Sequence, residues 1–537
     1  MIRSFALALA AALSCVALVL WLSDGVGWTR GYAYSGDELQ TMVMSKALIE
    51  NGDAQFADRL NAPMGGDWRA FPLITPVEFG FIWVLGQLGA DCFQATGATF
   101  LLMVAMTTVV ALAAFRELEF APPICFVLAC AYTLQPFLWE HNLTHPHLLF
   151  PWAAGVAVAL LRLAQGGWEG RVPRWFLILA FLQGFSSLYL AYFAILLWLP
   201  ATLLGFCSRG RRAAGQAFFL LLPLLVGTAL HLFLVQAPHA QRAVPDALLD
   251  ERLSRPSRMS MGRRASESEL YGLKLRILLS PRPGHPLPPL AELAHKLHEP
   301  FPDDQPEAVM ARLGTLASLG LLIVLSGLLF PNLRKHQRPW ARPAMSLVLF
   351  LLLLACVGGF SAIINSTVLN KFRCYNRTLV FLSFYCLAFI GLWLPPRLRW
   401  WSLLLVPLLA IDQFIPRPRH FPTLAQRFEN DKIWVQQVEA FLPSGSSVYQ
   451  FPHRGALAPP ALHDLRSNEP AIGYLHGSSL RWSWGALPNI QSLWHRELQE
   501  LPWQQRLDKL RALGFGALWL DRHGLGPEAY QTERELT

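Results

Sequence analysis

The sequence has few charged residues for its length. Asp, Glu, Lys and Arg make up 15% of its 537 residues, whereas soluble domains usually contain about 25%. This shortage excludes an ordinary cytosolic enzyme. Apolar residues make up 53% of the chain, which excludes a disordered protein and is typical of a membrane protein with several spans.

Cysteine is scarce as well. The eight cysteines lie mostly within apolar runs and none has CxxC spacing, so the sequence predicts neither a disulfide framework nor a zinc site. Basic residues outnumber acidic ones, 45 to 36. Such an excess can indicate nucleic acid, but membrane chains collect positive charge in their cytoplasmic loops. We therefore expect no nucleic-acid partner.

Apolar runs about as long as a transmembrane helix recur along the chain. We predict eleven spans, at about 4–22, 97–115, 121–138, 148–164, 175–187, 190–207, 217–235, 313–330, 345–363, 378–394 and 401–416. The run 175–207 is too long for one upright helix, so we divide it at 184–189. Segment 71–90 contains prolines, glycines and Glu78, and we expect it to be juxtamembrane or re-entrant.

The basic residues orient these spans, because short cytoplasmic loops carry most of the Lys and Arg. The short loops on the other side hold Lys371, Arg373 and Arg377. The fourteen on the expected cytoplasmic side are Arg3, Arg116, Arg162, Arg171, Arg174, Arg209, Arg211, Arg212, Arg334, Lys335, Arg338, Arg342, Arg397 and Arg399. We expect a multi-pass protein of a bacterial inner membrane, with a cytoplasmic N-terminus.

Three regions are then expected on the outer, periplasmic side: the loops 23–97 and 236–312, and the tail 417–537. The tail mixes strand-like runs at 447–451 and 517–520 with a helix-like run at 503–513. The predicted fold is therefore an α-helical polytopic transmembrane domain (1–416) followed by a small extracytoplasmic α/β domain (417–537).

An acidic pair opens a predicted helix in the first outer loop. Asp37 and Glu38 precede apolar residues spaced three and four apart, a pattern typical of an amphipathic helix. The helix dipole alone favours acidic residues there. A carboxylate at the outer face could also act as a general base on an acceptor hydroxyl. Asp67, in the turn-rich stretch that follows, is a candidate for the border of a substrate pocket.

Histidines gather between the third and fourth predicted spans. His141, His145 and His147 lie next to Glu140 in the sequence, which fits contact with a substrate or phosphate, a divalent metal, or a structural role. Pro146 interrupts any regular helical spacing of metal ligands. These alternatives stay open on the sequence alone.

A cationic segment stands at the outer mouth of the tenth predicted span. Lys371, Arg373 and Arg377, with Asn376 between them, oppose the general charge trend, which suggests a bound anion such as a lipid phosphate. The planar guanidinium of Arg matches phosphate oxygens. The alternative is that these long side chains only reach toward the interface.

Five more residues are candidates for substrate contact. The middle loop contributes Tyr271, Lys274 and His285. Lys274 and His285, with Arg276, could add to an anion site, although a solvated loop is the simpler interpretation. The tail contributes Trp482 and Trp484. Tryptophan can stack on sugar rings, but it is also a common core residue.

Together these stretches resemble the GT-C superfamily of membrane glycosyltransferases. More narrowly, the chain is similar to bacterial polytopic proteins described as surface-polysaccharide sugar transferases or translocases. The stretches that carry the resemblance are short and lie at 36–38, 61–67, 141–151, 269–275, 358–360 with 373–377, and 480–486.

The resemblance implies transfer of a sugar from a polyprenyl-phosphate donor lipid to a glycan, lipid or protein acceptor of the cell envelope. It implies Asp37 as the base, with Glu38 close by, and Arg373 and Arg377 at the lipid phosphate. We add Lys371, Asn376, His145 and His147 to the expected phosphate site.

Cofactor and mechanism are less constrained. We identify no second acidic metal-binding motif, so no cofactor is certain and a divalent metal stays open. A single displacement of the donor phosphate at the anomeric carbon would invert the configuration of that carbon. The alternatives are a translocase or flippase for lipid-linked sugars, which would leave the acidic pair and the tail unexplained, and a non-catalytic factor of polysaccharide assembly.

Overall fold

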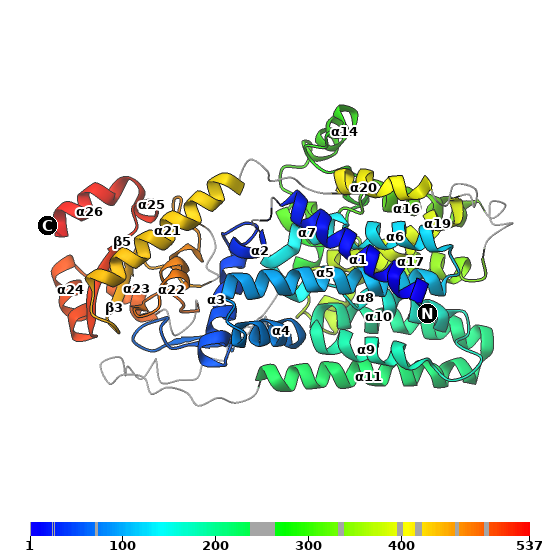
Figure 1. Cartoon of the computed structure of the whole chain (residues 1–537), viewed down its shortest axis with the longest axis horizontal. Coiled ribbons are helices and arrows are strands. Elements are labelled where there is room, and N and C mark those ends of the chain that lie inside the picture. The colour runs from blue at the N-terminus through cyan, green and yellow to red at the C-terminus, as the bar shows by residue number, and fades with distance from the viewer. Residues whose placement is uncertain are drawn as a thin grey trace.

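The computed structural model describes residues 2–23, 25, 27–69, 74–236, 264–330, 338–394, 401–413, 421–456, 461–487 and 493–536. Helices dominate (Figure 1), and seven apolar helical segments among these residues are long enough to cross a membrane. They are Phe5–Leu22, Cys92–Glu117, Pro122–Trp139, Pro146–Ala164, Leu188–Arg209, Arg211–Val235 and Tyr375–Trp393. The protein is therefore a polytopic helical membrane protein.

The helices of this bundle come from three stretches of the chain. They are α1 (Ile2–Leu22), α5 (Cys92–Glu117), α6 (Pro122–Thr133), α7 (Pro136–His141), α8 (Ala153–Ala164), α9 (Arg174–Ser186), α10 (Leu188–Arg209), α11 (Arg211–Gln236), α16 (Thr315–Leu329), α17 (Ala341–Ala355), α18 (Phe360–Thr367), α19 (Leu379–Trp393) and α20 (Leu405–Gln413). Short 3-10 turns adjoin them: η1 (Asn142–Thr144), η2 (Pro146–Leu148), η5 (Tyr375–Thr378) and η7 (Trp401–Leu404).

Each of the eleven expected spans contains an apolar helix, but four of these helices are shorter than a full span. The short ones are Arg174–Ser186, Thr315–Leu329, Ala341–Ala355 and Trp401–Gln413. Residues 414–416 of the last expected span lie outside the described residues. The expected span 345–363 is wrong as one helix, because α17 ends at Ala355 and α18 begins at Phe360. Gly358 lies between them at φ +77°, where a residue with a side chain would be strained.

The long apolar run 175–207 is broken where expected. Ser187 is extended, and its hydroxyl caps α10. At one end the Trp168 amide, before α9, donates to Gln216 of α11 (2.8 Å); at the other, His231 of α11 donates to the carbonyl of Phe185 in α9 (2.8 Å). Helices α9 and α11 therefore run parallel and pack directly against each other, and α10 connects them by running in the opposite direction. The loops before α9 and after α10 lie at the same end of the bundle.

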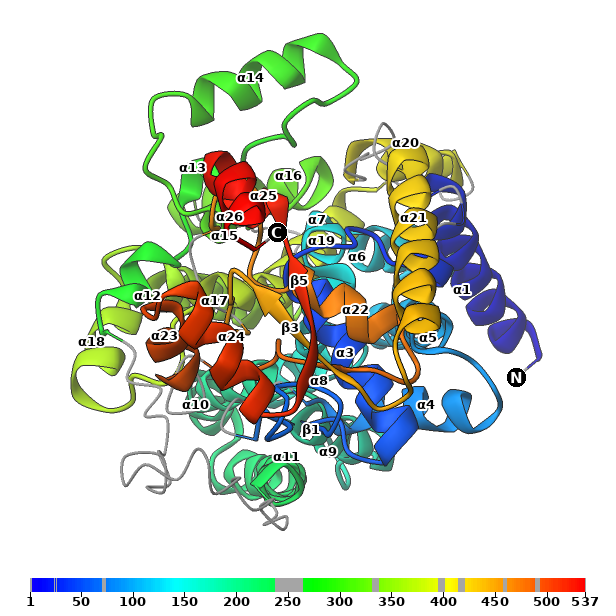
Figure 2. The same ribbon diagram turned by 90° about the vertical axis from the view of Figure 1, so that its left-hand side faces the viewer.

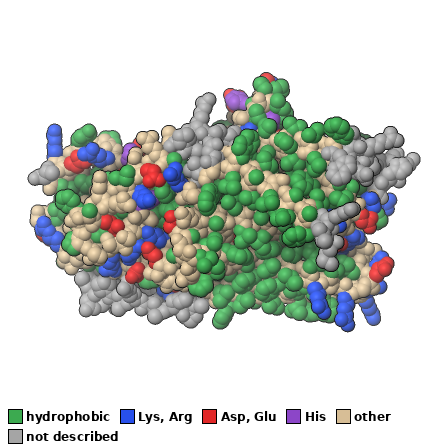
Figure 3. All heavy atoms as spheres, viewed as in Figure 1, with side chains coloured by type: hydrophobic (Ala, Val, Ile, Leu, Met, Phe, Trp, Pro, Cys, Tyr) green, Lys and Arg blue, Asp and Glu red, His purple; other side chains and the backbone are tan. Residues whose placement is uncertain are grey.

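The bundle carries a hydrophobic belt between two more polar ends. Figure 3 shows hydrophobic side chains covering the middle of the molecule, with charged ones mainly toward the ends. The N-terminus lies at one end and the tail at the other (Figure 1). Exposed apolar side chains of α1 and α11 include Phe5, Leu9, Phe218, Phe219 and Phe233. This is the surface that a helix facing lipid needs.

The basic residues expected in the cytoplasm gather at the end away from the tail. Arg162 donates to the carbonyl of Glu117 at the end of α5, and Arg338 pairs with Glu119 at 2.8 Å. Arg334, Lys335, Arg397, Arg399 and the side chain of Arg3 lie outside the described residues. The expected cytoplasmic basic residues that the structure describes thus lie at one end of the bundle. That this end faces the cytoplasm stays a prediction.

The first outer loop contains three helices and a short antiparallel pair of strands. Its elements are α2 (Gly27–Arg30), α3 (Asp37–Asn51), β1 (Phe56–Ala57), β2 (Gly66–Asp67) and α4 (Pro76–Gln87). Helix α4 has 12 residues, about 18 Å, which is too short to span a bilayer. Residues 71–73 lie outside the described residues.

Helix α3 was predicted to be amphipathic, but in the structure it is not. Its polar Gln40, Thr41 and Ser45 are buried along with its apolar residues. Helices α4 and α5 and the tail all contact it, so it lacks the exposed face that the prediction required. The sequence pattern could not reveal this, because the tail lies more than 400 residues further along.

The middle loop packs against the end of the bundle that faces the tail. Its helices are α12 (Glu267–Leu270), α13 (Leu275–Leu278), α14 (Pro288–His298) and α15 (Pro306–Val309); residues 237–263 lie outside the described residues. Leu273 pairs with the turn after α17, and the Asn376 amide donates to the Tyr271 carbonyl at 3.1 Å. Helix α14 projects sideways from the rest of the molecule (Figure 2).

The tail is the α/β unit that the sequence predicted. Its elements are α21 (Phe421–Phe441), β3 (Ser447–Phe451), η8 (Glu469–Ala471), α22 (Ile472–His476), β4 (Arg481–Trp482), α23 (Leu493–Gln499), α24 (Trp503–Ala512), β5 (Phe515–Leu520), α25 (Arg522–Leu525), η10 (Gly526–Glu528) and α26 (Ala529–Leu536). The strands form a parallel sheet in the order β4-β3-β5. The predicted boundary at 416/417 lies outside the described residues.

The tail is joined to the first outer loop by backbone hydrogen bonds. The amides of Asn61 and Ala62 donate to the carbonyls of Trp484 (2.7 Å) and Trp482 (3.0 Å), and the Trp482 amide donates back to the Arg59 carbonyl (2.8 Å). The first loop and the tail therefore form one continuous structure at the end of the bundle that faces the tail.

Candidate functional site

A cavity of about 540 Å³ lies at the end of the bundle that faces the tail. The first outer loop, the histidine segment, α10, α11 and the cationic segment form its wall. Its described lining residues are Asp37, Thr41, Met44, Ile74, Thr75, Phe79, Thr144, His145, Pro146, His147, Leu188, Tyr189, Tyr192, Ile195, Thr228, His231, Leu232, Leu369, Lys371, Phe372, Arg373 and Arg377. Six residues predicted for the site thus share one cavity.

Asp37 is the acidic residue among these described lining residues. It begins α3, and about half of its side chain is accessible. Its Oδ2 lies 3.5 Å from Nε2 of His145. Burial and the nearby Glu307 carboxylate raise the pKa of Asp37, while Arg373 and Arg377 act in the opposite direction.

Glu38 is placed differently from its neighbour. Its side chain is buried and does not line the cavity; it accepts hydrogen bonds from the amides of Ala33 (2.9 Å) and Tyr34 (3.2 Å). A Cβ at Gly31 would come within 2.0 Å of its carboxylate. In this arrangement Glu38 holds the turn that leads into α3, and the catalytic role predicted for it stays a prediction.

The three histidines divide into two groups. His145 and His147 line the cavity, whereas His141 is buried behind it, with Nδ1 3.0 Å from the Phe137 carbonyl. Burial lowers the pKa of His145 to about 3 and that of His141 to about 4. Both rings are therefore neutral near pH 7. His145 can exchange hydrogen bonds with Asp37 but adds no positive charge to the cavity.

The two arginines of the cationic segment reach the cavity with partners of their own. Arg373 pairs with Glu267 at 3.1 Å and lies over the ring of Tyr271, 4.6 Å from its centre. Burial opposes the charge of Arg373, but the neighbouring Cys374 and Glu267 raise its pKa overall. Tyr271 thus contributes through Arg373 and does not itself line the cavity.

Arg377 is the more enclosed of the two. It is 5% exposed, pairs with Glu307 at 2.7 Å and lies 4.1 Å from the centre of the Tyr189 ring. Asn376 points away from the cavity lining and donates to the Glu307 carbonyl at 2.8 Å. Asn376 therefore supports the residue that holds Arg377, and the phosphate contact predicted for it stays a prediction.

Glu307 is the main residue that sequence reasoning missed. Burial acts to raise its pKa, but Arg377 and the nearby histidines outweigh it and lower the pKa to about 2. Glu307 therefore carries a full negative charge beside Arg377. It lies in a Pro- and Asp-rich stretch of the middle loop, and its pairing depends on how that loop folds back. Tyr189 and His231 were also missed, although polar residues at the ends of spans are a usable signal.

Three other predicted contacts lie away from the lining. Asp67 pairs with Arg69 in the first outer loop, Lys274 pairs with Asp304, and His285 lies 3.3 Å from Asp412. The Asp67 pair lies within one short segment, the Lys274 pair lies within the middle loop, and His285 joins that loop to α20. Their positions fit structural roles and not the substrate contacts that we predicted.

The two candidate tryptophans belong to the core of the tail. Trp482 and Trp484 are 0% and 1% exposed, and the Trp484 ring nitrogen donates to the Ser467 carbonyl at 2.8 Å. Neither ring has a free face in this arrangement, and the carbohydrate contact predicted for these positions stays a prediction.

A metal site finds no support in the geometry. The described residues contain no group of three or more His, Cys, Asp or Glu side chains placed to hold a metal ion. The side chain of Glu140, which belongs to the predicted histidine group, lies outside the described residues.

Comparison with known proteins gives no family. No protein-family model and no curated protein matches the sequence. The interpretation of the cavity therefore depends on its own geometry and chemistry.

Proposed function

We propose that the protein is a membrane glycosyltransferase that uses a polyprenyl-phosphate-linked sugar as donor. The observation that carries the proposal is the meeting of Asp37 with Lys371, Arg373 and Arg377 in one cavity at the outer end of the bundle. A base and a set of phosphate-binding cations are the two functions that this transfer requires.

The rest of the lining suits a lipid. Apolar side chains from four parts of the wall face the cavity, among them Met44, Phe79, Ile195 and Leu232. A prenyl chain gains free energy by leaving water for such a surface. The cationic segment lies beside these residues, which fits a donor whose phosphate is bound next to its hydrocarbon.

The reaction needs one displacement. Asp37 takes the proton of the acceptor hydroxyl while the hydroxyl oxygen attacks the anomeric carbon. The bond between that carbon and the phosphate oxygen breaks, and its electron pair goes to the phosphate. The stereochemistry inverts. The raised pKa of Asp37 suits a base that works near neutral pH, and His145 at 3.5 Å is placed to orient the carboxylate.

The two arginines contribute mainly through the orientation of their N–H donors and less through their net charge. Glu267 and Glu307 already balance much of the charge of Arg373 and Arg377. A guanidinium has five N–H donors in a fixed plane, so donors that do not face the carboxylate can meet phosphate oxygens. The carboxylates would then fix the planes of the two arginines before the donor arrives.

The test is donor consumption by the purified protein in detergent, with release of free polyprenyl phosphate measured by mass spectrometry. Asp37→Asn is expected to lower the rate of transfer by about 1000-fold or more. Asp91→Asn is the matched control: Asp91 caps α5 by accepting from the Gln94 amide at 2.8 Å, and Asn caps equally well.

An Asp37→Asn protein as active as the control would overturn the proposal. Movement of the intact donor across liposome membranes without its consumption would instead support the translocase.

A further inference from the structure

The tail contacts the turn that immediately precedes Asp37. The side-chain amide of Asn468 donates to the carbonyl of Gly36 at 3.0 Å, and Arg466 donates to the hydroxyl of Ser35 at 3.2 Å. Both tail residues lie just before η8. The residue next to the proposed base is therefore held by a segment more than 400 positions away.

This turn has a backbone that needs outside support. Tyr34 has φ +45° and Gly36 has φ +57°, and a non-glycine residue at positive φ persists only where its surroundings hold it. Tyr34 is buried, and its hydroxyl lies 2.7 Å from Nε2 of His476 in α22. Its ring packs against Phe428 of α21 at 5.3 Å. Two helices of the tail, α21 and α22, thus pack against Tyr34 in this turn.

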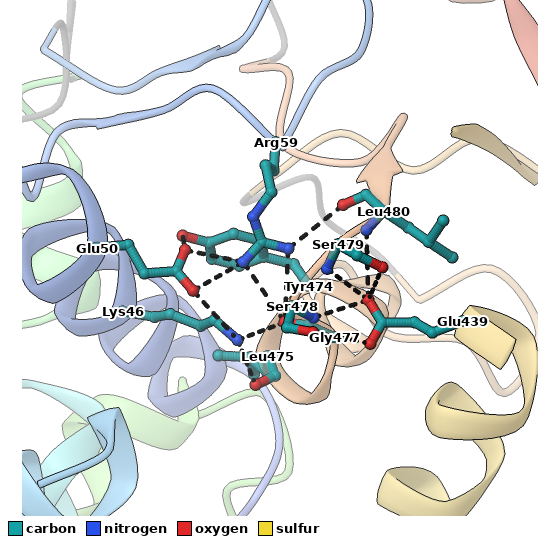
Figure 4. Close-up of polar contacts among 10 residues, drawn as sticks. All are labelled: Lys46, Glu50, Arg59, Glu439, Tyr474, Leu475, Gly477, Ser478, Ser479 and Leu480. Atoms are coloured by element: carbon teal, nitrogen blue, oxygen red, sulfur yellow. Dashed lines mark hydrogen bonds and ion pairs between the residues drawn. The ribbon is translucent and has the colours of Figure 1, made fainter. Parts of the chain in front are cut away.

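The same tail segment also grips the far half of α3 (Figure 4). Lys46 donates to the carbonyls of Leu475 (3.0 Å) and Gly477 (2.6 Å). Arg59 pairs with Glu50 at 2.8 Å and lies over the ring of Tyr474, 4.7 Å from its centre. These contacts fix the tail segment relative to the body of the helix.

The segment is itself held in shape from behind. Glu439 of α21 accepts hydrogen bonds from the backbone amides of Ser478 (2.7 Å) and Ser479 (2.6 Å), as Figure 4 shows. A carboxylate that accepts several amide hydrogen bonds stiffens a loop. The tail segment 466–480 therefore contacts α3 near both ends while being anchored to α21.

We propose that segment 466–480 is a clamp that sets the direction of the Asp37 carboxylate, with Asn468 as a positioning residue. The inference rests on the proposed role of Asp37 as base. The far contacts fix the axis of α3, and the contacts at residues 34–36 fix its first turn, from which Asp37 points into the cavity. A small change in the placement of a reacting group can cost up to about 100-fold in rate.

The experiment compares Asn468→Ala with the full-length wild type. The value of kcat for transfer is expected to fall about 10- to 100-fold, while KM for the donor stays unchanged because Lys371, Arg373 and Arg377 are untouched. Hydrogen exchange of the amides at 33–42 is expected to rise about fivefold, the effect of losing one hydrogen bond. Exchange does not depend on any transfer activity.

Asn430→Ala is the matched control, since it makes the same Asn-to-Ala change at an exposed position of α21, outside segment 466–480; it should change neither quantity. If Asn468→Ala does not fold, His476→Phe replaces it. Phe keeps the ring packed on Phe93, which His476 contacts at 5.6 Å between ring centres, but loses the bond to Tyr34. A smaller change in the same direction is expected.

Wild-type kcat and wild-type exchange in Asn468→Ala would overturn the clamp, as would a rise in KM alone. An active Asp37→Asn protein would overturn the proposed function instead, and the exchange measurement would still decide whether the tail holds the turn.

Discussion

The two ends of the helical bundle use arginine in opposite ways. At the end away from the tail, arginines extend into solvent; at the end that carries the cavity, Arg373 and Arg377 are paired with carboxylates and packed on tyrosine rings. The exposed arginines of the first end include Arg116, Arg171, Arg174, Arg209, Arg211 and Arg212.

The difference follows from the cost of removing a charge from water. An exposed guanidinium keeps its hydration and needs no partner, so it is free to serve orientation alone. A guanidinium such as that of Arg377, 5% exposed, has lost most of its water and needs a carboxylate in its place. The same kind of charged residue therefore indicates the orientation of the spans at one end and a preorganised binding site at the other.

Breaking the prepared end should have the largest effect. Arg377→Gln removes a donor to the departing phosphate and leaves the partly buried Glu307 without its guanidinium. Transfer is expected to fall about 100- to 1000-fold, and stability by about 3 kcal/mol, measured by the transfer assay and by thermal unfolding in detergent. Arg377→Gln combined with Glu307→Gln should recover stability but not transfer. Recovery of both would show that Arg377 is only a structural residue.

A moderate effect is expected for pH. The base works only when deprotonated, so the transfer rate should fall as pH drops through the raised pKa of Asp37. Glu307→Gln removes a negative charge that raises this pKa, so the acid limb should move to lower pH. Each pH unit of movement corresponds to about tenfold in relative rate on that limb. A profile that stays in place, or moves to higher pH, would contradict this account of the site.

The smallest effect is expected at the other end. Arg211→Gln with Arg212→Gln removes two charges that are exposed and lie far from the cavity. Transfer should stay within about twofold, because surface charges contribute little to structure. A large loss of transfer, with unchanged orientation of the spans by cysteine labelling, would erase the contrast between the two ends.

The spans were predictable because a membrane imposes a simple rule on composition and length. The break at Ser187 could be predicted from the excessive length of the run, and the strands of the tail from their apolar residues. The end of α17 at Ala355 could not, because apolar residues continue beyond it. There the backbone conformation of Gly358 decides, and hydropathy does not record it.

The site was predictable to the extent that topology alone brings its residues together. Placing Asp37 and Arg377 on one side of the bundle was enough to predict that they could meet. Glu307 could not be found in this way, because its pairing depends on the path of the middle loop. The burial of Trp482 and Trp484 could not be predicted, because aromatic composition does not tell a buried ring from an accessible one.

The hydrogen bond between Asn468 and Gly36 joins residues 432 positions apart. A ribosome makes the chain from its N-terminus, so the first outer loop emerges long before the segment that holds its turn. Until the tail has been synthesised and has folded, Asp37 stands on a turn without its support. The proposed base thus acquires its final geometry among the last steps of synthesis, which would keep a half-made chain from consuming a donor lipid.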